Sequence, residues 1–399
     1  MKKIPQNIFY YSVLLTGAWL LGLAGESIYA PAMPAIAKQL SVSETFVKLT
    51  ISYFILGKTL SMFLCSPIAE AFGRRQYILF GLGLFVIGGL FCGLTSNIHF
   101  LLAGRLIQGL GCSIIILMGR AIVNDFFQGG YAAKVFSYIF TGNAIGIFIF
   151  PALGGYMAAY LGWRWIFLIL SVYGLVIFFI MWKFLPQTNP TSNLSSLKPA
   201  KILDNYRTLF KSKVLWGFLL AVAFMMAGEK AYSTSAAFLF INKLGLSSIQ
   251  YGYLTTGIWA AHLSGTVLAG WTGVRWGIDR VNFIGIVLLT IASLLLLGLA
   301  LAGLLKVTVF VASMLIYMFG TGFIIVSAAV GIVRPFPQLV GFATAFAMAF
   351  EFAISFGSSF IISHHPSSME DIAEMVGAMG LLAFVAWGVF LFKTNSNCR

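Results

Sequence analysis

The sequence predicts an all-α polytopic membrane protein whose twelve transmembrane helices form two pseudo-symmetric six-helix bundles. Of its 399 residues, 60% are hydrophobic and only 9% are charged, whereas about 25% of residues are charged in a typical soluble domain. Apolar runs of about 20 residues recur along the chain, and each is long enough to cross a bilayer core of about 30 Å. Two short segments also recur about half a chain length apart, which indicates a duplicated unit.

Twelve spans are expected, with starts near residues 8, 45, 76, 98, 132, 163, 214, 248, 281, 307, 338 and 374. Their unbroken apolar character favours helices, because the strands of a membrane barrel alternate apolar and polar residues. The first span is not interpreted as a signal peptide, since a related stretch recurs in the middle of the chain.

The 25 lysine and arginine residues lie mainly in loops that would share one side of the membrane if both termini were cytoplasmic. The positive-inside rule favours this orientation and an even number of spans. The net charge of +14 is spread over short loops, so no nucleic-acid-binding patch is indicated.

One long polar segment, "PQTNPTSNLSSLKPAKILDNYRTLFKSK", divides the chain. It predicts an N-terminal bundle over residues 1–185, a cytoplasmic linker over 186–213 and a C-terminal bundle over 214–399. Ile202, Leu203, Tyr206, Leu209 and Phe210 fall at helical spacing inside the linker. This spacing indicates a short helix on the inner leaflet, with a solvated loop as the alternative.

The two halves resemble each other. "GESIY" at residues 25–29 returns as "GEKAY" at 228–232, so Glu229 follows Glu26 by 203 residues. "AFGRR" returns as "RWGID", and Gly277 follows Gly73 by 204 residues. Lys58 and His262 are also 204 residues apart, which places a basic side chain at an equivalent depth in each half. A duplicated six-helix unit is typical of parallel-repeat transporters, whose substrate site lies near the bilayer midplane.

Three motifs carry a resemblance to a known family. "SPIAEAFGRRQYIL" (residues 66–79) resembles the loop between helices 2 and 3 of the major facilitator superfamily. Gly73 permits a tight turn there, and Arg74 and Arg75 anchor the loop on the cytoplasmic side. The family's usual aspartate is Glu70 in this chain, and the resemblance implies that Glu70 steadies the outward-facing state.

"LLAGRLIQGLG" (residues 101–111) resembles the family's helix 4 motif. Arg105 and Gln108 lie three residues apart and therefore on one helix face. An arginine inside a span is expected to face a cavity or a carboxylate. The alternative is that Arg105 snorkels to the outer interface.

"GNAIGIFIFPALGG" (residues 142–155) resembles the helix 5 motif of drug exporters. Gly142, Gly146 and Gly155 permit close backbone approach, and Pro151 permits a bend. Asn143 in this motif is a candidate cavity residue.

"YAPAMPAIAKQL", "VKLTISYFILGKTL", "GRAIVNDFF" and "GWRWIFLI" are similar to the bicyclomycin-resistance (Bcr/CflA) subgroup of twelve-span drug:proton antiporters. Arg120 and Asp125 match the inner end of the subgroup's helix 4, where a gate or docking pair is implied and helix capping is the alternative. The subgroup's helix 1 aspartate corresponds to Ser27, and the carboxylate here lies one residue earlier, at Glu26.

Ionisable residues within the expected spans are candidate functional sites, because a charge in lipid is costly. Low dielectric favours a protonated carboxyl group, so the candidate proton sites are Glu229 and Glu26, followed by Glu351. Tyr29 and Tyr232 lie three residues after the first two and could donate to them. The substrate-cavity candidates are Lys58, Arg105, Gln108, Asn143, Tyr29, Tyr232, Lys230, Trp259 and His262. The alternative for Glu229 and Lys230 is a position near the outer interface.

The resemblance implies proton-coupled export, that is antiport, of a small organic molecule or drug by alternating access. Proton-coupled import on the same fold is the alternative. Enzymatic activity is not expected, because the chain has no His-Glu-x-x-His or Gly-x-Ser-x-Gly motif. We expect no cofactor, no metal site and no nucleic-acid partner. The expected protein is a monomer in a plasma membrane, the inner membrane of a bacterium, with a small-molecule substrate, protons and lipid as its partners.

Overall fold

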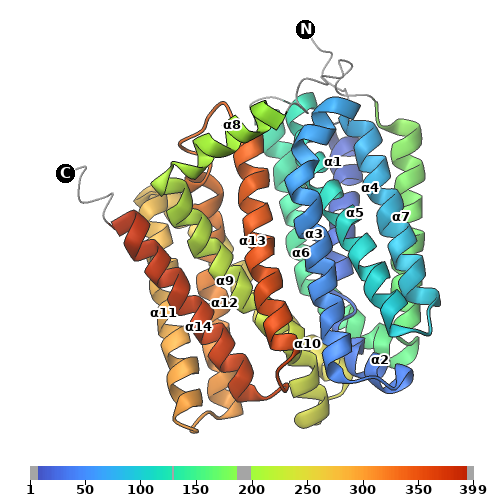
Figure 1. Cartoon of the computed structure of the whole chain (residues 1–399), viewed down its shortest axis with the longest axis vertical. Coiled ribbons are helices and arrows are strands. Elements are labelled where there is room, and N and C mark those ends of the chain that lie inside the picture. Colours follow the sequence, from blue (N-terminus) through green and yellow to red (C-terminus); the bar gives the residue numbers. More distant parts are fainter. Residues whose placement is uncertain (1–7, 128–129, 187–198, 393–399) are drawn as a thin grey trace. The chain divides into compact units, whose positions relative to one another are not determined.

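Helices make up the fold of this chain in the computed structural model, which describes residues 8–127, 130–186 and 199–392 (Figure 1). The first half contains α1 (Ile8–Ser27), η1 (Ala30–Ala32), α2 (Met33–Leu40), α3 (Glu44–Phe72), α4 (Arg74–Leu94), α5 (Ile98–Phe126), α6 (Gly130–Tyr160) and α7 (Trp163–Phe184). The second half contains α8 (Pro199–Phe210), α9 (Lys213–Ala237), η3 (Phe238–Lys243), α10 (Ser248–Trp276), α11 (Ile278–Leu301), α12 (Val307–Gly331), α13 (Val340–Ser363), α14 (Met369–Trp387) and η4 (Gly388–Phe392).

The predicted polytopic all-α fold is confirmed. Eleven helical segments in the described residues are long and apolar enough to cross a membrane. A twelfth long helix, α10, begins at residue 248, where a span is expected. It carries several polar residues in its interior, among them Thr255, Thr256 and His262.

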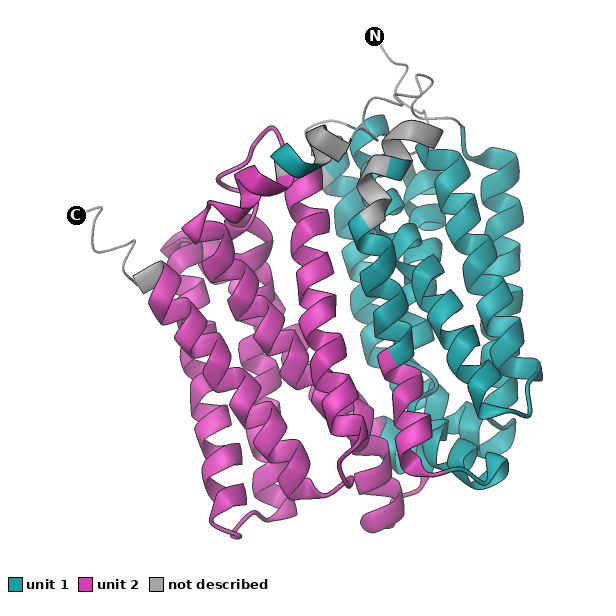
Figure 2. Ribbon diagram, in the orientation of Figure 1, with its two compact units in different colours: residues 1–42, 53–204, 248–252 teal, residues 43–52, 205–247, 253–399 magenta. Residues whose placement is uncertain are grey.

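The chain divides into two compact units, shown in teal and magenta in Figure 2. Unit 1 comprises residues 1–42, 53–204 and 248–252, and unit 2 comprises residues 43–52, 205–247 and 253–399. The first turns of α3 therefore pack with unit 2, and the first turn of α10 packs with unit 1. The boundaries expected from the sequence, at residues 185 and 213, assign residues 43–52 and 248–252 to the opposite units.

Each unit uses the same set of helix pairs. In unit 1, α4 packs against α5 and α7, and α1 packs against α6 and α5. In unit 2, α11 packs against α12 and α14, and α9 packs against α13 and α12. The correspondence of these pairs extends the short sequence repeats to the packing of the whole unit.

The repeat is also visible in the backbone at two turns. Gly73 precedes α4 with φ 90° and ψ 142°, and Gly277 precedes α11 with φ 79° and ψ 159°. Side chains other than hydrogen are disfavoured at such positive φ values. The predicted tight turn at Gly73 is thus confirmed.

A helix forms in the linker, as predicted, so the solvated-loop alternative is wrong. The apolar side of α8 packs on unit 2: Tyr206 lies 4.8 Å from Phe342 and 5.6 Å from Phe346 between ring centroids. Phe210 contacts Trp216 at 5.3 Å, and Leu209 is fully buried. Aromatic rings of α9 and α13 therefore contact part of the apolar side of α8, while Leu203 and Phe210 stay about half exposed, at 51% and 50%.

Gly154 is the closest backbone contact of α6. A Cβ atom at this position would lie 1.9 Å from the carbonyl oxygen of Ile28. We therefore expect Gly154→Ala to force α1 and α6 apart and to destabilise the protein by about 2 kcal/mol or more. The measurement is the thermal unfolding midpoint of the purified protein in detergent.

Gly83→Ala in α4 is the matched control, since nothing lies within 4 Å of its added methyl group. An alanine there is expected to leave stability unchanged or to raise it by up to about 1 kcal/mol. Equal unfolding midpoints for the two variants would refute this view of the α1–α6 contact.

Candidate functional site

Two prolines fix the position of Glu26 at a helix end. Pro31 and Pro34 lack the N–H groups that would continue α1, so α1 stops at Ser27 and the chain proceeds through η1 into α2. Glu26 consequently lies in the last turn of α1. Glu229, its counterpart in the repeat, lies inside the uninterrupted helix α9.

Glu26 forms an ion pair with Lys58 of α3. The Lys58 Nζ lies 2.9 Å from the Glu26 Oε2, and the two side chains are 6% and 19% exposed. The backbone carbonyl of Lys58 accepts a hydrogen bond from the Ser113 hydroxyl at 3.0 Å. Unit 1 thus holds a carboxylate and a lysine together in a largely buried setting.

Arg105 lies beside this pair and is completely buried. Its Nη1 donates to the carbonyl of Gly25 at 2.8 Å and to the Gln108 Oε1 at 2.6 Å. Its guanidinium also lies over the rings of Tyr29 and Phe54, 4.4 and 4.1 Å from their centroids. The snorkelling alternative for Arg105 is therefore wrong.

The hydrogen bonds of Arg105 also connect it to a helix end. The Gly25 carbonyl belongs to the C-terminal turn of α1, where the helix dipole is negative and favours a cation. Arg105 and Gln108 do lie together, as predicted. Together with Tyr29 they support the helix end that carries Glu26.

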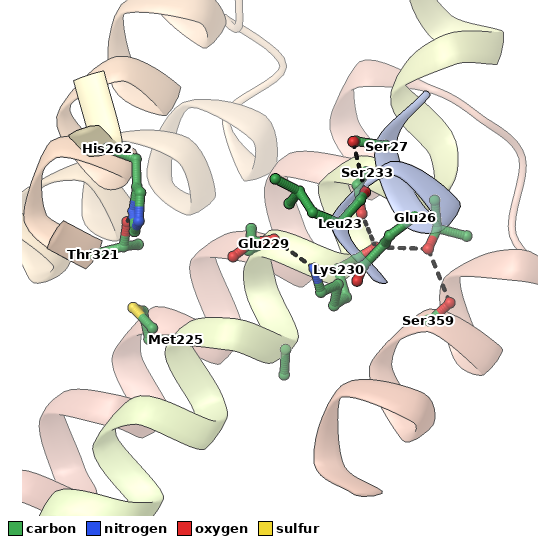
Figure 3. Close-up of polar contacts among 12 residues, drawn as sticks. Leu23, Glu26, Ser27, Met225, Glu229, Lys230, Ser233, His262, Thr321 and Ser359 are labelled. Carbon is green, nitrogen blue, oxygen red and sulfur yellow. Dashed lines mark hydrogen bonds and ion pairs between the residues drawn. The ribbon is translucent and has the colours of Figure 1, made fainter. Parts of the chain in front are cut away.

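Glu229 and Lys230 form the ion pair of unit 2 (Figure 3). The Lys230 Nζ lies 2.7 Å from the Glu229 Oε1, and the side chains are only 7% and 4% exposed. Consecutive residues point about 100° apart on a helix, but the four methylene groups of lysine let its Nζ reach back to the carboxylate.

Both residues lie in the middle of their span. The apolar segment runs from Lys213 to Lys243, with Gly228 at its midpoint. The burial and the central position of Glu229 and Lys230 contradict the alternative that places them near the outer interface.

Hydroxyl groups surround this part of α9. Tyr317 of α12 donates to the carbonyl of Met225 at 2.9 Å, and Ser358 of α13 donates to the carbonyl of Ala227 at 2.8 Å. Thr234 donates to the carbonyl of Lys230 at 2.6 Å. The backbone on both sides of Glu229 is thus fixed by polar contacts.

His262 of α10 faces the same region. Its Nδ1 lies 2.7 Å from the hydroxyl of Thr321, and its ring lies edge-on to Trp259 with 5.4 Å between centroids. The charges of Glu229 and Lys230 act on the His262 ring. The structure therefore gathers four candidates in unit 2: Glu229, Lys230, Trp259 and His262.

The remaining candidates are buried or half-buried within their helices. The Tyr232 ring is buried and lies 6.3 Å from Phe310. Glu351 is half-buried in α13, two turns before Ser358, and belongs to neither ion pair. Asn143 is half-buried in α6.

The structure gives Asp125 a partner that the sequence does not suggest. Asp125 pairs with Arg74, whose Nε lies 3.0 Å from the Asp125 Oδ2, while Arg120 lies over the Trp19 ring at 5.2 Å. Arg74 also donates to the carbonyl of Ala121 at 2.6 Å, in the last turns of α5. Asp125 thus joins the α3–α4 turn to the end of α5.

The rest of the loop motif follows the same pattern. Arg75 donates to the carbonyl of Trp182 in α7, so both arginines tie α4 to neighbouring helices of unit 1. The side chain of Glu70 lies outside the described residues.

The helix 5 motif packs as its small residues predict. A Cβ atom on Gly142 would lie 2.3 Å from the Thr16 side chain, and one on Gly146 would lie 2.7 Å from that of Leu20. A Cβ on Gly155 would lie 2.6 Å from the carbonyl of Ser248 in α10, and the Pro151 carbonyl faces Gly252 of the same helix. The motif therefore brings α6 close to α1 and to the first turn of α10.

A polar stripe on α3 lies outside the candidate residues predicted from the sequence. Lys48 is 1% exposed and donates to the carbonyls of Ile362 and His365 at 3.3 and 2.6 Å, at the C-terminal end of α13. Glu44 accepts from Ser367 at 3.0 Å, and Ser52 contacts Ser359 at 2.8 Å.

The stripe explains why the first turns of α3 pack with unit 2. Glu44, Lys48 and Ser52 recur every four residues and so line one helix face. This spacing is the sequence signal that could have revealed the stripe.

Comparison with known proteins agrees with this architecture. The family model of the Major Facilitator Superfamily matches residues 15–359. An uncharacterized transporter, YdgK of Bacillus subtilis, is 30% identical over 63% of this chain and 63% of its own length. Multidrug resistance protein D of Escherichia coli is 26% identical over 96% of this chain and 95% of its own.

A third relative, the chloramphenicol resistance protein CraA of Acinetobacter baumannii, is 24% identical over 69% of this chain and 66% of its own. Several matches, the one to YdgK included, span less than two thirds of the relative's length.

Solved structures share the fold at low sequence identity. The xylose transporter XylE of E. coli, in a partially occluded inward-open conformation, has a TM-score of 0.74 at 15% identity and matches 97% of this chain and 98% of its own. A bacterial homolog of the human lysosomal transporter Spinster has a TM-score of 0.71 at 15% identity, over 97% of this chain and 98% of its own. These likenesses concern the fold alone. The duplicated six-helix pattern, the glycine turn at Gly73 and the family match lead to one conclusion: this chain belongs to the Major Facilitator Superfamily.

Proposed function

We propose that this protein is a secondary active transporter that exports a small organic molecule or drug in exchange for protons, by alternating access. One observation carries the proposal: each unit holds a carboxylate–lysine ion pair among its spanning helices, Glu26–Lys58 in unit 1 and Glu229–Lys230 in unit 2. Relatives named for multidrug, bicyclomycin and chloramphenicol resistance support export as the direction.

The ion pairs can exist in two states. With the pair closed, the carboxylate is ionised and its charge is balanced by the lysine. A proton on the carboxyl group removes that balance, so the lysine is released and its charge must be met by water or by a bound polar group. In a low dielectric, charges and dipoles near the pair strongly affect which state is favoured. Binding of substrate beside the pair can therefore favour the ionised carboxylate and expel the proton. Competition of this kind couples the two fluxes in opposite directions.

The charges in the site bear on the substrate class. Lys58 and Lys230 each face a carboxylate, and Arg105 donates to a backbone carbonyl and a glutamine. The three basic side chains therefore do not present an open anion site. A neutral or zwitterionic amphipathic molecule fits this arrangement best.

The proton gradient supplies enough energy for export. One proton that moves down a membrane potential of 100 mV releases about 2.3 kcal/mol. A tenfold concentration ratio costs about 1.36 kcal/mol. One proton per molecule therefore sustains roughly a fiftyfold gradient of a neutral substrate.

The cellular setting belongs to the same proposal. The protein resides as a monomer in a bacterial plasma membrane with both termini in the cytoplasm, in line with its loop charges. The proton gradient is its energy source, so the proposed cycle involves no cofactor and no covalent chemistry.

Proton-coupled import is the second candidate function, because the same fold hosts symport. A proton:xylose symporter shares it with a TM-score of 0.72 at 17% identity. Direction has to be settled by transport measurements, since fold does not determine function.

The test uses proteoliposomes with equal pH on both sides, a lumenal pH dye, and potassium with valinomycin to hold the potential at zero. Chloramphenicol, a neutral compound, is added outside. Antiport predicts that the lumen becomes more alkaline, because each entering molecule drives a proton out. Symport predicts acidification. Uptake without a pH change, relative to protein-free liposomes, would refute proton coupling for this compound, and a panel of neutral and zwitterionic drugs extends the test.

A further inference from the structure

His262 occupies the position in unit 2 that Lys58 occupies in unit 1. The two residues are 204 residues apart, in the repeat-related helices α10 and α3. Lys58 reaches across to Glu26. In unit 2 the cation that meets the carboxylate is Lys230, which comes from α9 itself. His262 is therefore not needed as the counter-ion of Glu229 and can have another role.

The contacts of Thr321 define the protonation of the His262 ring. The Thr321 hydroxyl donates its single proton to the carbonyl of Met318 at 2.6 Å. It must therefore accept the hydrogen bond from His262, whose Nδ1 lies 2.7 Å away. A neutral imidazole carries one N–H, so this network assigns the proton to Nδ1 and the lone pair to Nε2.

Polar and charged groups surround the His262 ring. Within the described residues, the Nε2 of His262 has no hydrogen-bond partner. The ring is 9% exposed, and Trp259 covers one edge. The charged groups that act on it are Glu229 and Lys230 of α9. From α12 the ring meets Thr321, one turn after Tyr317, whose hydroxyl is bound to the carbonyl of Met225.

We propose that His262 is a second proton-binding group of unit 2, which exchanges a proton with Glu229 through its Nε2 atom. The proposal rests on the proton coupling put forward above. In the exchange, the Glu229 O–H bond breaks, an Nε2–H bond forms, and the net charge of the group stays the same.

Two features of the site fit this exchange. After the transfer the Glu229 carboxylate recovers its ion pair with Lys230, and the imidazolium carries the single positive charge that the unpaired lysine carried before. Nδ1 keeps donating to Thr321 in both protonation states, so the ring does not have to turn.

The first experiment observes His262 without transport. Three substitutions, His99→Gln, His364→Gln and His365→Gln, leave His262 as the only histidine. Nitrogen-15 spectra of this protein in lipid nanodiscs should show a neutral ring protonated at Nδ1, whose Nε2 gains a proton as pH falls from 9 to 5. The titration should shift in the Glu229→Gln variant. A ring protonated at Nε2, or one that does not titrate in this range, would overturn the proposal.

The second experiment compares net transport with substrate counterflow in the same vesicles. Counterflow exchanges substrate for substrate and needs no net proton movement. For His262→Gln, which keeps a donor for Thr321 but cannot take up a proton, we expect the ratio of proton-driven transport to counterflow to fall by about tenfold or more. Ser264→Ala is the control, since that exposed hydroxyl bonds only to its own helix, and its ratio should match the wild type.

The two experiments separate the two proposals. A wild-type ratio for His262→Gln would overturn the role of His262 while coupling itself stands. If the wild-type protein moves substrate with no proton flux, the proposed function fails, and the spectra alone decide whether His262 binds a proton.

Discussion

Arg105→Ala is expected to cause a large loss of stability, by about 3 to 5 kcal/mol. The substitution removes a fully buried side chain and leaves a cavity against the rings of Tyr29 and Phe54. It also leaves the Gly25 carbonyl and the Gln108 Oε1 without their donor. The thermal unfolding midpoint in detergent should fall by on the order of 10 °C.

Two comparisons test the cause of this loss. Arg105→Lys retains the charge but loses the planar fork and the stacking, so its midpoint should lie between those of the wild type and Arg105→Ala. Arg120→Ala in the same helix removes a less buried arginine that lies over the Trp19 ring, and it should cost less stability than Arg105→Ala. Equal losses of stability for Arg105→Ala and Arg120→Ala would contradict this explanation. They would show that the buried contacts of Arg105 stabilise the protein no more than those of the less buried Arg120.

Glu229→Gln is expected to abolish proton-driven transport and to destabilise the protein. The amide cannot bind a proton, and it leaves the Lys230 ammonium without its carboxylate in a site where both side chains are less than a tenth exposed. Loss of one partner of a buried ion pair costs about 3 to 5 kcal/mol. Accumulation driven by a pH gradient should fall to the level of protein-free liposomes, as measured with radiolabelled substrate.

The double variant Glu229→Gln with Lys230→Met distinguishes an effect on stability from an effect on proton coupling. It removes both charges, so most of the lost stability should return. Replacing a buried ion pair by uncharged groups changes the free energy of unfolding little. Proton coupling should stay absent. A double variant that recovers proton-driven transport would exclude Glu229 as the proton carrier.

Glu26→Gln serves as the comparison in unit 1. Its side chain is 19% exposed against 4% for Glu229, so water can replace more of the lost pairing. We expect a smaller loss of stability than for Glu229→Gln. The variant that retains less proton-driven transport then identifies the carboxylate that contributes more to carrying the proton.

The features that sequence predicted well are local. Helix positions follow from runs of apolar residues, and Gly73 follows from a turn that demands positive φ. The small residues of the helix 5 motif contact α1 because their spacing already defines a helix face. Each of these depends on neighbours within a few residues in the chain.

The features that the sequence did not predict depend on the length of flexible side chains and on contacts between residues distant in the chain. Lys230 meets Glu229 because a long flexible side chain overrides the helical angle between the two positions. Asp125 binds Arg74, 51 residues earlier, and no pattern near Asp125 marks this partner. Burial of Arg105 requires three aromatic rings that are distant in sequence, those of Tyr29 after α1, Phe54 in α3 and Phe167 in α7. Such contacts are decided by packing of the whole unit.

The measurement that tests the central claim most directly is the number of protons released per substrate molecule taken up. It is made by recording lumenal pH and substrate uptake together in proteoliposomes at zero potential. The wild type is expected to alkalinise the lumen in proportion to substrate entry. The Glu229→Gln, Lys230→Met double variant is expected to exchange substrate in counterflow with no pH change. Alkalinisation by the double variant at the wild-type ratio of protons to substrate would contradict the account.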